Sequence, residues 1–178
     1  MILRQKSALD GFTYEFLEDG TSMVIGDFRY PWFSQAKNAR LRLYRPEDAI
    51  EGDIQLKLNG HAWRIRHLHL RRGYTNDVRY TLEAADETIH AQMDVLKGES
   101  RLSQPLMVMD QPTPAELSTS SGWFRKKYTL MDRKTRHSLG NIQERSIITT
   151  KRELQIDLPS FEPSVAAFWG IMTLIVRF

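Results

Sequence analysis

Basic side chains gather in three short clusters in the last third of the chain, and their chemistry suits an anionic ligand. Arginine presents forked N–H donors and lysine a compact point charge, and both bind phosphate or carboxylate oxygens. We therefore predict an anion-binding site at a rim of the fold, for a lipid headgroup such as a phosphoinositide or for a protein partner. The candidates are Arg125, Lys126, Lys127, Arg133, Lys134, Arg136, Lys151 and Arg152.

The sequence leaves open whether these clusters share one end of the molecule. If four or five of them face an anionic membrane, each contributes about 1 kcal/mol, which gives weak and salt-sensitive docking. The ordinary role of such charges is to solvate turns and strand ends. A second candidate patch consists of Arg64, Arg66, Arg71 and Arg72.

Nucleic acid is a further alternative, because the same cations could track a phosphate backbone. Exposed aromatic rings would have to add base stacking, and Trp32, Phe33 and Trp123 are the candidates. The net charge of +3 is well short of the dense basic stripe of a dedicated nucleic-acid binder. We therefore do not expect nucleic acid to be the partner.

Residue patterns typical of catalysis are absent from the sequence. His67 and His69 fall on one strand face, but no third ligand follows at metal-site spacing and the chain has no cysteine. There is no Gly-x-Ser-x-Gly elbow, phosphate-binding loop or His-Glu-x-x-His pattern. We expect a non-enzymatic binding module with no catalytic, metal or cofactor residues. The alternative is a small hydrolase-like enzyme whose pocket the sequence does not reveal.

The last 16 residues are the element around which the chain must be organised. Residues 163–178 are apolar on every side, and such a helix has to be buried on all sides. It is shorter than the ~20 residues that span a bilayer, so we predict a core helix. Pro163 suits its first turn and Ser160 its N-cap. The predicted core residues are Val165, Phe168, Trp169, Ile171, Met172 and Ile175.

Alternating strands fill most of the remaining chain. Tyr14 and Phe16 begin a hairpin around a two-residue Asp19-Gly20 turn, and Asn59-Gly60 predicts a tight hairpin with Leu56 opposite Trp63. After residue 66 the alternating apolar residues change from odd positions, such as Trp63 and Ile65, to even ones, Leu68 and Leu70. This change predicts a bulge at 66–67. Further strands are predicted at 40–45, 78–82, 89–95, 106–109, 147–150 and 153–158.

The first hairpin recurs 114 positions later without a gap. Tyr14 falls on Tyr128 and Gly26 on Gly140, and the Tyr-Thr-Leu of residues 80–82 recurs at 128–130. Chance similarity between alternating hairpins is the alternative explanation. We predict one domain of two similar halves, about 11–96 and 123–178, joined by a connector at about 97–122. Such a mainly β chain would close into an antiparallel barrel around the C-terminal helix.

Several of these segments resemble a known family. Residues 128–132, 139–142 and 153–157 and the terminal apolar helix are similar to the tubby C-terminal-like superfamily, in its phospholipid-scramblase and LURP-one-related branch. The resemblance implies a barrel of about twelve strands around a central hydrophobic helix, with lipid-headgroup or membrane association. The chain departs from the family in lacking the cysteines of scramblase lipid anchors. Nor does it have a spaced acidic loop suited to calcium.

The sequence also bears on where in the cell the protein is expected. The first twelve residues contain no apolar run long enough for a signal peptide, and we expect no transmembrane span. A cytoplasmic protein, peripheral at the membrane where lipid is bound, is therefore the expectation.

Overall fold

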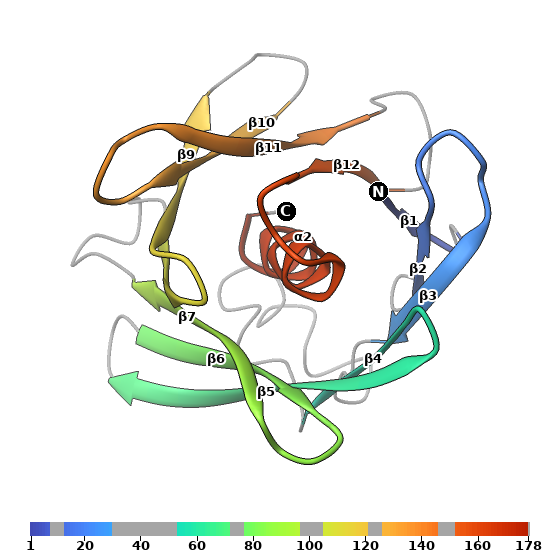
Figure 1. Ribbon diagram of the computed structural model, residues 1–178, viewed down its shortest axis with the longest axis horizontal. Helices are drawn as coiled ribbons and strands as arrows, with labels where there is room; N and C mark the ends of the chain where they lie inside the picture. Colours follow the sequence, from blue (N-terminus) through green and yellow to red (C-terminus); the bar gives the residue numbers. More distant parts are fainter. Residues whose placement is uncertain are drawn as a thin grey trace, which may run out of the picture.

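The structure is a closed antiparallel barrel filled by a helix. This computed structural model describes residues 1–7, 13–29, 53–71, 77–96, 105–120, 126–145 and 152–177. Within them twelve strands pair in chain order, and β1 closes the ring on β12 (Figure 1). The strands are β1 Ile2–Gln5, β2 Thr13–Leu17, β3 Val24–Arg29, β4 Ile54–Leu58, β5 His61–Arg71, β6 Asp77–Ala84, β7 Ile89–Leu96, β8 Leu106–Gln111, β9 Ala115–Ser120, β10 Lys127–Asp132, β11 Ser138–Glu144 and β12 Glu153–Asp157.

Helix α2, Pro163–Arg177, runs through the centre of the ring, as the sequence predicted. Its six predicted core residues are all buried, namely Val165, Phe168, Trp169, Ile171, Met172 and Ile175. The buried hydroxyl of Thr173 donates to the Trp169 carbonyl at 2.8 Å, so it needs no partner from the barrel. The predicted N-cap was wrong, because Ser160 lies in a turn and the helix begins at Pro163. Among the described residues no helix is long and apolar enough to cross a bilayer.

The two ends of the barrel differ in how the chain turns. The turns of the β2–β3, β4–β5, β6–β7, β8–β9 and β10–β11 hairpins all lie at one end, where α2 also begins. We call this end the turn rim, and it faces the viewer in Figure 1. Because adjacent strands are antiparallel, the other ends of these strands and the end of α2 share the opposite rim, which we call the helix-end rim.

The first hairpin is longer than predicted. Leu17 pairs with Val24, so residues 18–23 form the turn and the predicted two-residue Asp19-Gly20 turn was wrong. The observed register places Tyr14 opposite Phe28, with the two rings stacked at 5.1 Å. It also places Gly26 beside β4, where a side chain would collide with the Lys57 carbonyl oxygen. These contacts with later residues select the register that a local turn rule could not.

The second hairpin is as predicted, but the residues of β5 that face inward are not the predicted ones. Leu56 pairs with Trp63 across the Asn59-Gly60 turn, and both turn residues have positive φ. The predicted bulge at 66–67 was wrong, because β5 stays in phase there and its irregularity lies between His69 and Arg71. Leu68 and Leu70 therefore face outward and are 63% and 43% exposed.

Three hairpins share one register, which divides the barrel into three consecutive four-strand units. Unit I is β1–β4, unit II is β5–β8 and unit III is β9–β12. In each unit the second strand has an inward tyrosine, and two residues later an apolar residue that pairs with a Gly or Ala on the third strand. The pairing register of the two strands shifts directly after that apolar residue. The matching pairs are Phe16 with Gly26, Leu82 with Ala91, and Leu130 with Gly140.

The turns of these hairpins match as well. In each hairpin, the residue two positions after Phe16, Leu82 or Leu130 donates its backbone N–H to a carbonyl on the other side of the turn. The residue just before that carbonyl-bearing residue has a positive φ. The donor and acceptor pairs are Glu18 and Met23, Ala84 and Thr88, and Asp132 and His137, and the positive-φ residues are Ser22, Glu87 and Arg136. The 114-residue match between the first and last hairpins is thereby confirmed at the level of register.

Some strands were missed and some predicted segments lie outside the described residues. β1 was not predicted, and β9 lies within the stretch read as a connector, since its alternating Ala115 and Leu117 were hidden among serines and threonines. The predicted strands at 106–109 and 153–158 correspond to β8 and β12. Residues 40–45 and 147–150 are outside the described residues.

Truncation of the central helix is expected to remove a large part of the stability. Trp169 is fully buried between helix and barrel, so Trp169→Ala should lower the free energy of unfolding by about 3–5 kcal/mol. Met23→Ala, at an exposed position, is the control and should change it by less than about 0.5 kcal/mol. Urea denaturation measures both, and equal losses would contradict the burial of Trp169.

The small residue opposite β10 is also expected to be indispensable. Gly140 has a φ of 138°, and a Cβ there would collide with the Asp157 carbonyl oxygen of β12. Gly140→Ala should therefore cost about 2–4 kcal/mol. Gly20→Ala tests positive φ alone, since no atom lies within 4 Å of a Cβ there, and should cost about 1 kcal/mol. A smaller loss at Gly140 than at Gly20 in denaturant melts would refute the close approach.

Candidate anion-binding rim

The predicted basic clusters lie at opposite ends of one strand. β10 begins at Lys127 and ends at Asp132, so Lys126 and Lys127 are at the helix-end rim while Arg133, Lys134 and Arg136 are in the β10–β11 turn. A single site built from all the predicted cations is therefore excluded by strand direction. Arg125 and Lys151 lie outside the described residues.

At the turn rim, acidic neighbours neutralise most of the basic cluster. Arg133 forms an ion pair with Asp110, and Arg136 forms one with Glu116 on the neighbouring strand β9. The backbone N–H groups of Thr135 and Lys134 donate to the Asp132 carboxylate at 2.7 and 2.8 Å, which lowers the pKa of Asp132. The cluster thus holds its own turn closed.

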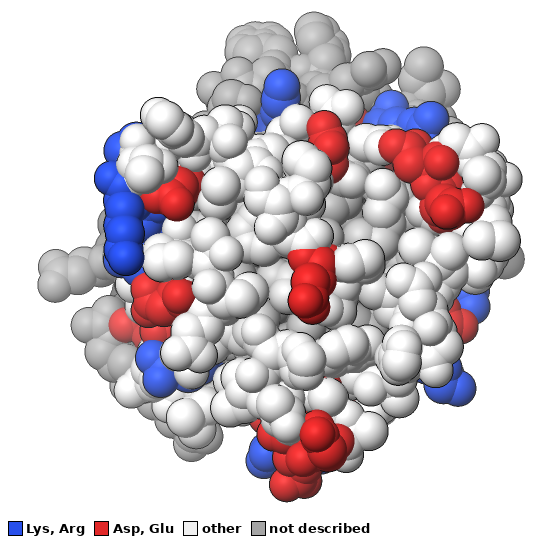
Figure 2. All heavy atoms as spheres, in the orientation of Figure 1, with Lys and Arg blue, Asp and Glu red and all other residues white. Residues whose placement is uncertain are grey.

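The rest of the turn rim is mainly acidic, although Lys57 lies beside the β4–β5 turn and Arg64 reaches Glu87 in the β6–β7 turn. Figure 2 shows this face, with the largest group of Lys and Arg at the edge over the β10–β11 turn, smaller basic groups at other edges, and acidic groups over the β2–β3 and β6–β7 turns and near the start of α2. The acidic residues of those turns are Glu18, Asp19, Asp86, Glu87 and Glu162. This rim is therefore a poor site for an anionic ligand.

The helix-end rim brings cations together from consecutive strands. The Glu144 N–H donates to the Lys126 carbonyl, the Arg145 N–H to the Glu153 carbonyl, and the Gln5 N–H to the Arg152 carbonyl, all at 2.9–3.0 Å. This ladder fixes the start of β10, the end of β11 and the start of β12 side by side. Neighbouring strands are about 4.8 Å apart, and Arg152 lies two residues beyond Leu154, the partner of Glu144, so the backbones of Lys126 and Arg152 are about 12 Å apart.

The cations of this rim face solvent. Lys126, Lys127, Arg145 and Arg152 are exposed, and the carboxylates beside them on β11 and β12 are Glu144 and Glu153. Arg145 pairs with Glu153 at 3.3 Å, and among the described residues here four cations lie beside two carboxylates. Side chains of lysine and arginine that reach from strands about 5 Å apart can converge on one phosphate group.

Besides Lys6, which pairs with Asp27 at 2.9 Å, sequence reasoning missed two further cations of this rim. Arg145 directly follows β11, and exposed Arg29 ends β3 on the far side of β1 and β2. Neither lies in a basic run, so cluster counting does not find them. These residues would be found only by asking which strand ends lie at the same rim, and that requires the strand topology.

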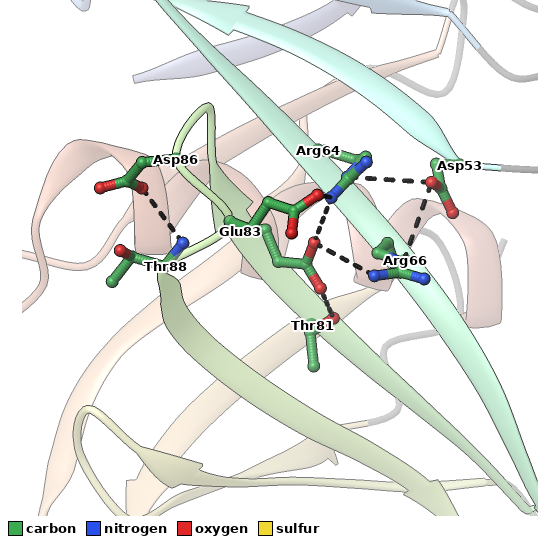
Figure 3. Close-up of polar contacts among 8 residues, drawn as sticks. Asp53, Arg64, Arg66, Thr81, Glu83, Asp86 and Thr88 are labelled. Carbon is green, nitrogen blue, oxygen red and sulfur yellow. Dashed lines mark hydrogen bonds and ion pairs between the residues drawn. The ribbon is translucent and has the colours of Figure 1, made fainter.

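The second predicted patch is an ion-pair network. Glu83 is only 5% exposed and receives Arg64 at 2.9 Å, while Arg66 approaches the same carboxylate at 3.8 Å (Figure 3). Asp53 lies 3.8 Å from Arg64, whose pKa is raised mainly by its hydrogen bond to Glu83. These arginines therefore join β4, β5 and β6 to one another. The Arg71 side chain and Arg72 lie outside what is described.

The two histidines face the barrel interior, where His67 pairs across the strands with Tyr80 and lies edge-on to His69 at 5.9 Å. Among the described residues no group of three histidine, cysteine or acidic side chains could hold a metal ion.

Comparisons of the chain with protein-family models, with curated proteins and with solved structures found no match.

The ion-pair network is expected to support stability. Glu83→Gln should lower the free energy of unfolding by about 1–3 kcal/mol, because a buried carboxylate loses charge-assisted hydrogen bonds from Arg64 and Thr81. Asp27→Asn breaks an exposed pair with Lys6 and should cost less than about 0.5 kcal/mol. If both variants melt alike in urea, Glu83 does not join the strands as described.

Proposed function

We propose that the protein is a non-enzymatic binding module of the tubby-like kind its motifs resemble, and that its helix-end rim binds anionic phospholipid headgroups. The observation that carries the proposal is the strand ladder that aligns Lys126, Lys127 and Arg152 at one rim. A barrel with a central helix is also the architecture that the resemblance implies.

The contrast between the two rims supports this choice of surface. Arg133 and Arg136 are held by Asp110 and Glu116, and the β2–β3 and β6–β7 turns of the same rim have acidic side chains. Among the described residues of the helix-end rim, the four exposed cations Lys126, Lys127, Arg145 and Arg152 lie beside two carboxylates. An anionic membrane would therefore be attracted to one end of the barrel and repelled by much of the other, which orients the protein before contact.

The helix adds to this preference only weakly. The C-terminal end of α2 lies at the helix-end rim, and a helix C-terminus has the partial negative charge that favours nearby cations. An acidic protein surface could use the same cations, and the experiment below separates it from lipid.

Vesicle flotation tests the proposal. The protein should float with vesicles of phosphatidylcholine containing phosphatidylserine or a phosphoinositide at low salt and less so at moderate salt, because surface charges are screened. Vesicles of phosphatidylcholine alone are the lipid control. Lys126→Gln/Lys127→Gln should lower partitioning about thirtyfold, since each cation contributes about 1 kcal/mol.

The matched control removes the same charge from the other rim. Arg133→Gln/Lys134→Gln should bind as the unmodified protein does. No flotation with any anionic vesicle at low salt would overturn the lipid assignment and leave an acidic protein as the candidate partner. Equal losses in both double variants would mean that net charge, and not the helix-end rim, drives binding.

A further inference from the structure

The outer face of unit II has exposed leucines close to the helix-end rim. Leu68 and Leu70 lie near the end of β5, and Leu106 is the first residue of β8 and 44% exposed. Leu106 pairs with the half-buried Leu96 on β7. β5 and β8 are separated by two strands, so these side chains span about 14 Å of the barrel wall.

The charges between these leucines cancel. Leu68 pairs across the strands with Arg79, whose guanidinium binds both carboxylate oxygens of Asp94 at 2.7 and 2.8 Å. A bidentate pair of this kind offers no net charge and few free donors. This ion pair therefore adds no net charge between the leucines, and several exposed apolar side chains within one unit are unusual for a surface that faces only water.

The three-unit repeat shows that the fold does not require leucine at these positions. With the shared register, Leu68 corresponds to Lys6 in unit I and Ser120 in unit III. Leu106 corresponds to Asp53 and Glu153. At the Leu68 and Leu106 positions the other two units hold polar or charged residues, so at these two positions the apolar character is particular to unit II.

The apolar residues and the basic residues lie on adjoining parts of one rim. Around the barrel, β8 with Leu106 is followed by β9 and then by β10 with Lys126 and Lys127. About 10 Å separates β8 from β10. Apolar side chains beside cations match the two layers of an anionic membrane surface, where acyl chains begin below the phosphates.

We propose that the protein docks on an anionic bilayer with the leucines of unit II in the interfacial layer and the cations of unit III on the lipid phosphates. This inference rests on the proposed function and specifies it, because insertion requires a bilayer and not a free headgroup. Binding then has a salt-sensitive part from the cations and a salt-resistant part from the leucines.

Serine substitution tests the apolar contact. Leu68→Ser/Leu70→Ser/Leu106→Ser should lower the partitioning that remains at moderate salt by about thirtyfold or more. Met23→Ser/Val24→Ser/Ile89→Ser is the matched control, because it changes three exposed apolar residues near the turn rim. It should bind as the unmodified protein does. Both variants alter exposed side chains, so their urea denaturation midpoints should stay close to that of the unmodified protein.

Site-specific fluorescence reports insertion directly. The chain has no cysteine, so Leu106→Cys and Ile89→Cys each provide a single site for an environment-sensitive dye. On phosphatidylserine-containing vesicles the dye at position 106 should shift to shorter wavelength, and the dye at 89 should not. A shift at both positions, or at neither in vesicle-bound protein, overturns the proposed orientation.

The outcomes distinguish this inference from the proposed function. If the unmodified protein does not float at low salt, both fail. If it floats but the leucine variant binds equally at both salt concentrations, or if free inositol hexakisphosphate abolishes binding at moderate salt, insertion fails while headgroup binding stands. If the unmodified protein is a dimer in light scattering and the leucine variant a monomer, the occupant is a second copy and the inference is overturned.

Discussion

Burial of α2 is the interaction on which the rest of the structure depends. The helix is apolar on every side, and its aromatic and aliphatic residues contact the inner faces of the surrounding strands. A helix with its side chains is about 10–12 Å across, which is too wide for the packed lumen of a small barrel. The closed twelve-strand ring supplies the necessary width, and the helix fills a lumen that would otherwise be wet. Each part therefore requires the other.

The barrel reaches this width by repeating one hairpin arrangement in each of its three units. An apolar residue faces Gly or Ala on the next strand, and the register shifts directly after it, in all three hairpins. A small residue allows the third strand to approach, as the crowding around Gly26 and Gly140 shows. Register shifts increase local twist, which closed sheets need. The proposed halves, 11–96 and 123–178, remain a prediction beside this three-fold repetition of hairpins.

Local signals were enough for much of the fold, and non-local ones account for the errors. The apolar helix and the Asn59-Gly60 hairpin depend on neighbouring residues, and the sequence predicted both. The first hairpin depends on contacts with Phe28 and β4, which turn chemistry does not encode. On β5, hydrophobicity suggested that Leu68 and Leu70 would turn inward, whereas His67 and His69 face inward. The basic clusters could be counted from sequence, but their separation follows from the direction of β10.

Repetition separates what the fold requires from what a single unit adds. The inward tyrosine, the apolar residue and the small residue recur, so they can be assigned to folding. Outward positions vary more: threonine recurs at 81 and 129, but Arg79 in unit II corresponds to Thr13 in unit I and Lys127 in unit III. One backbone environment thus accepts a paired arginine, a threonine and an exposed lysine. Because folding does not fix these choices, the charge of unit III and the leucines of unit II are the places where selection for binding can act independently of stability.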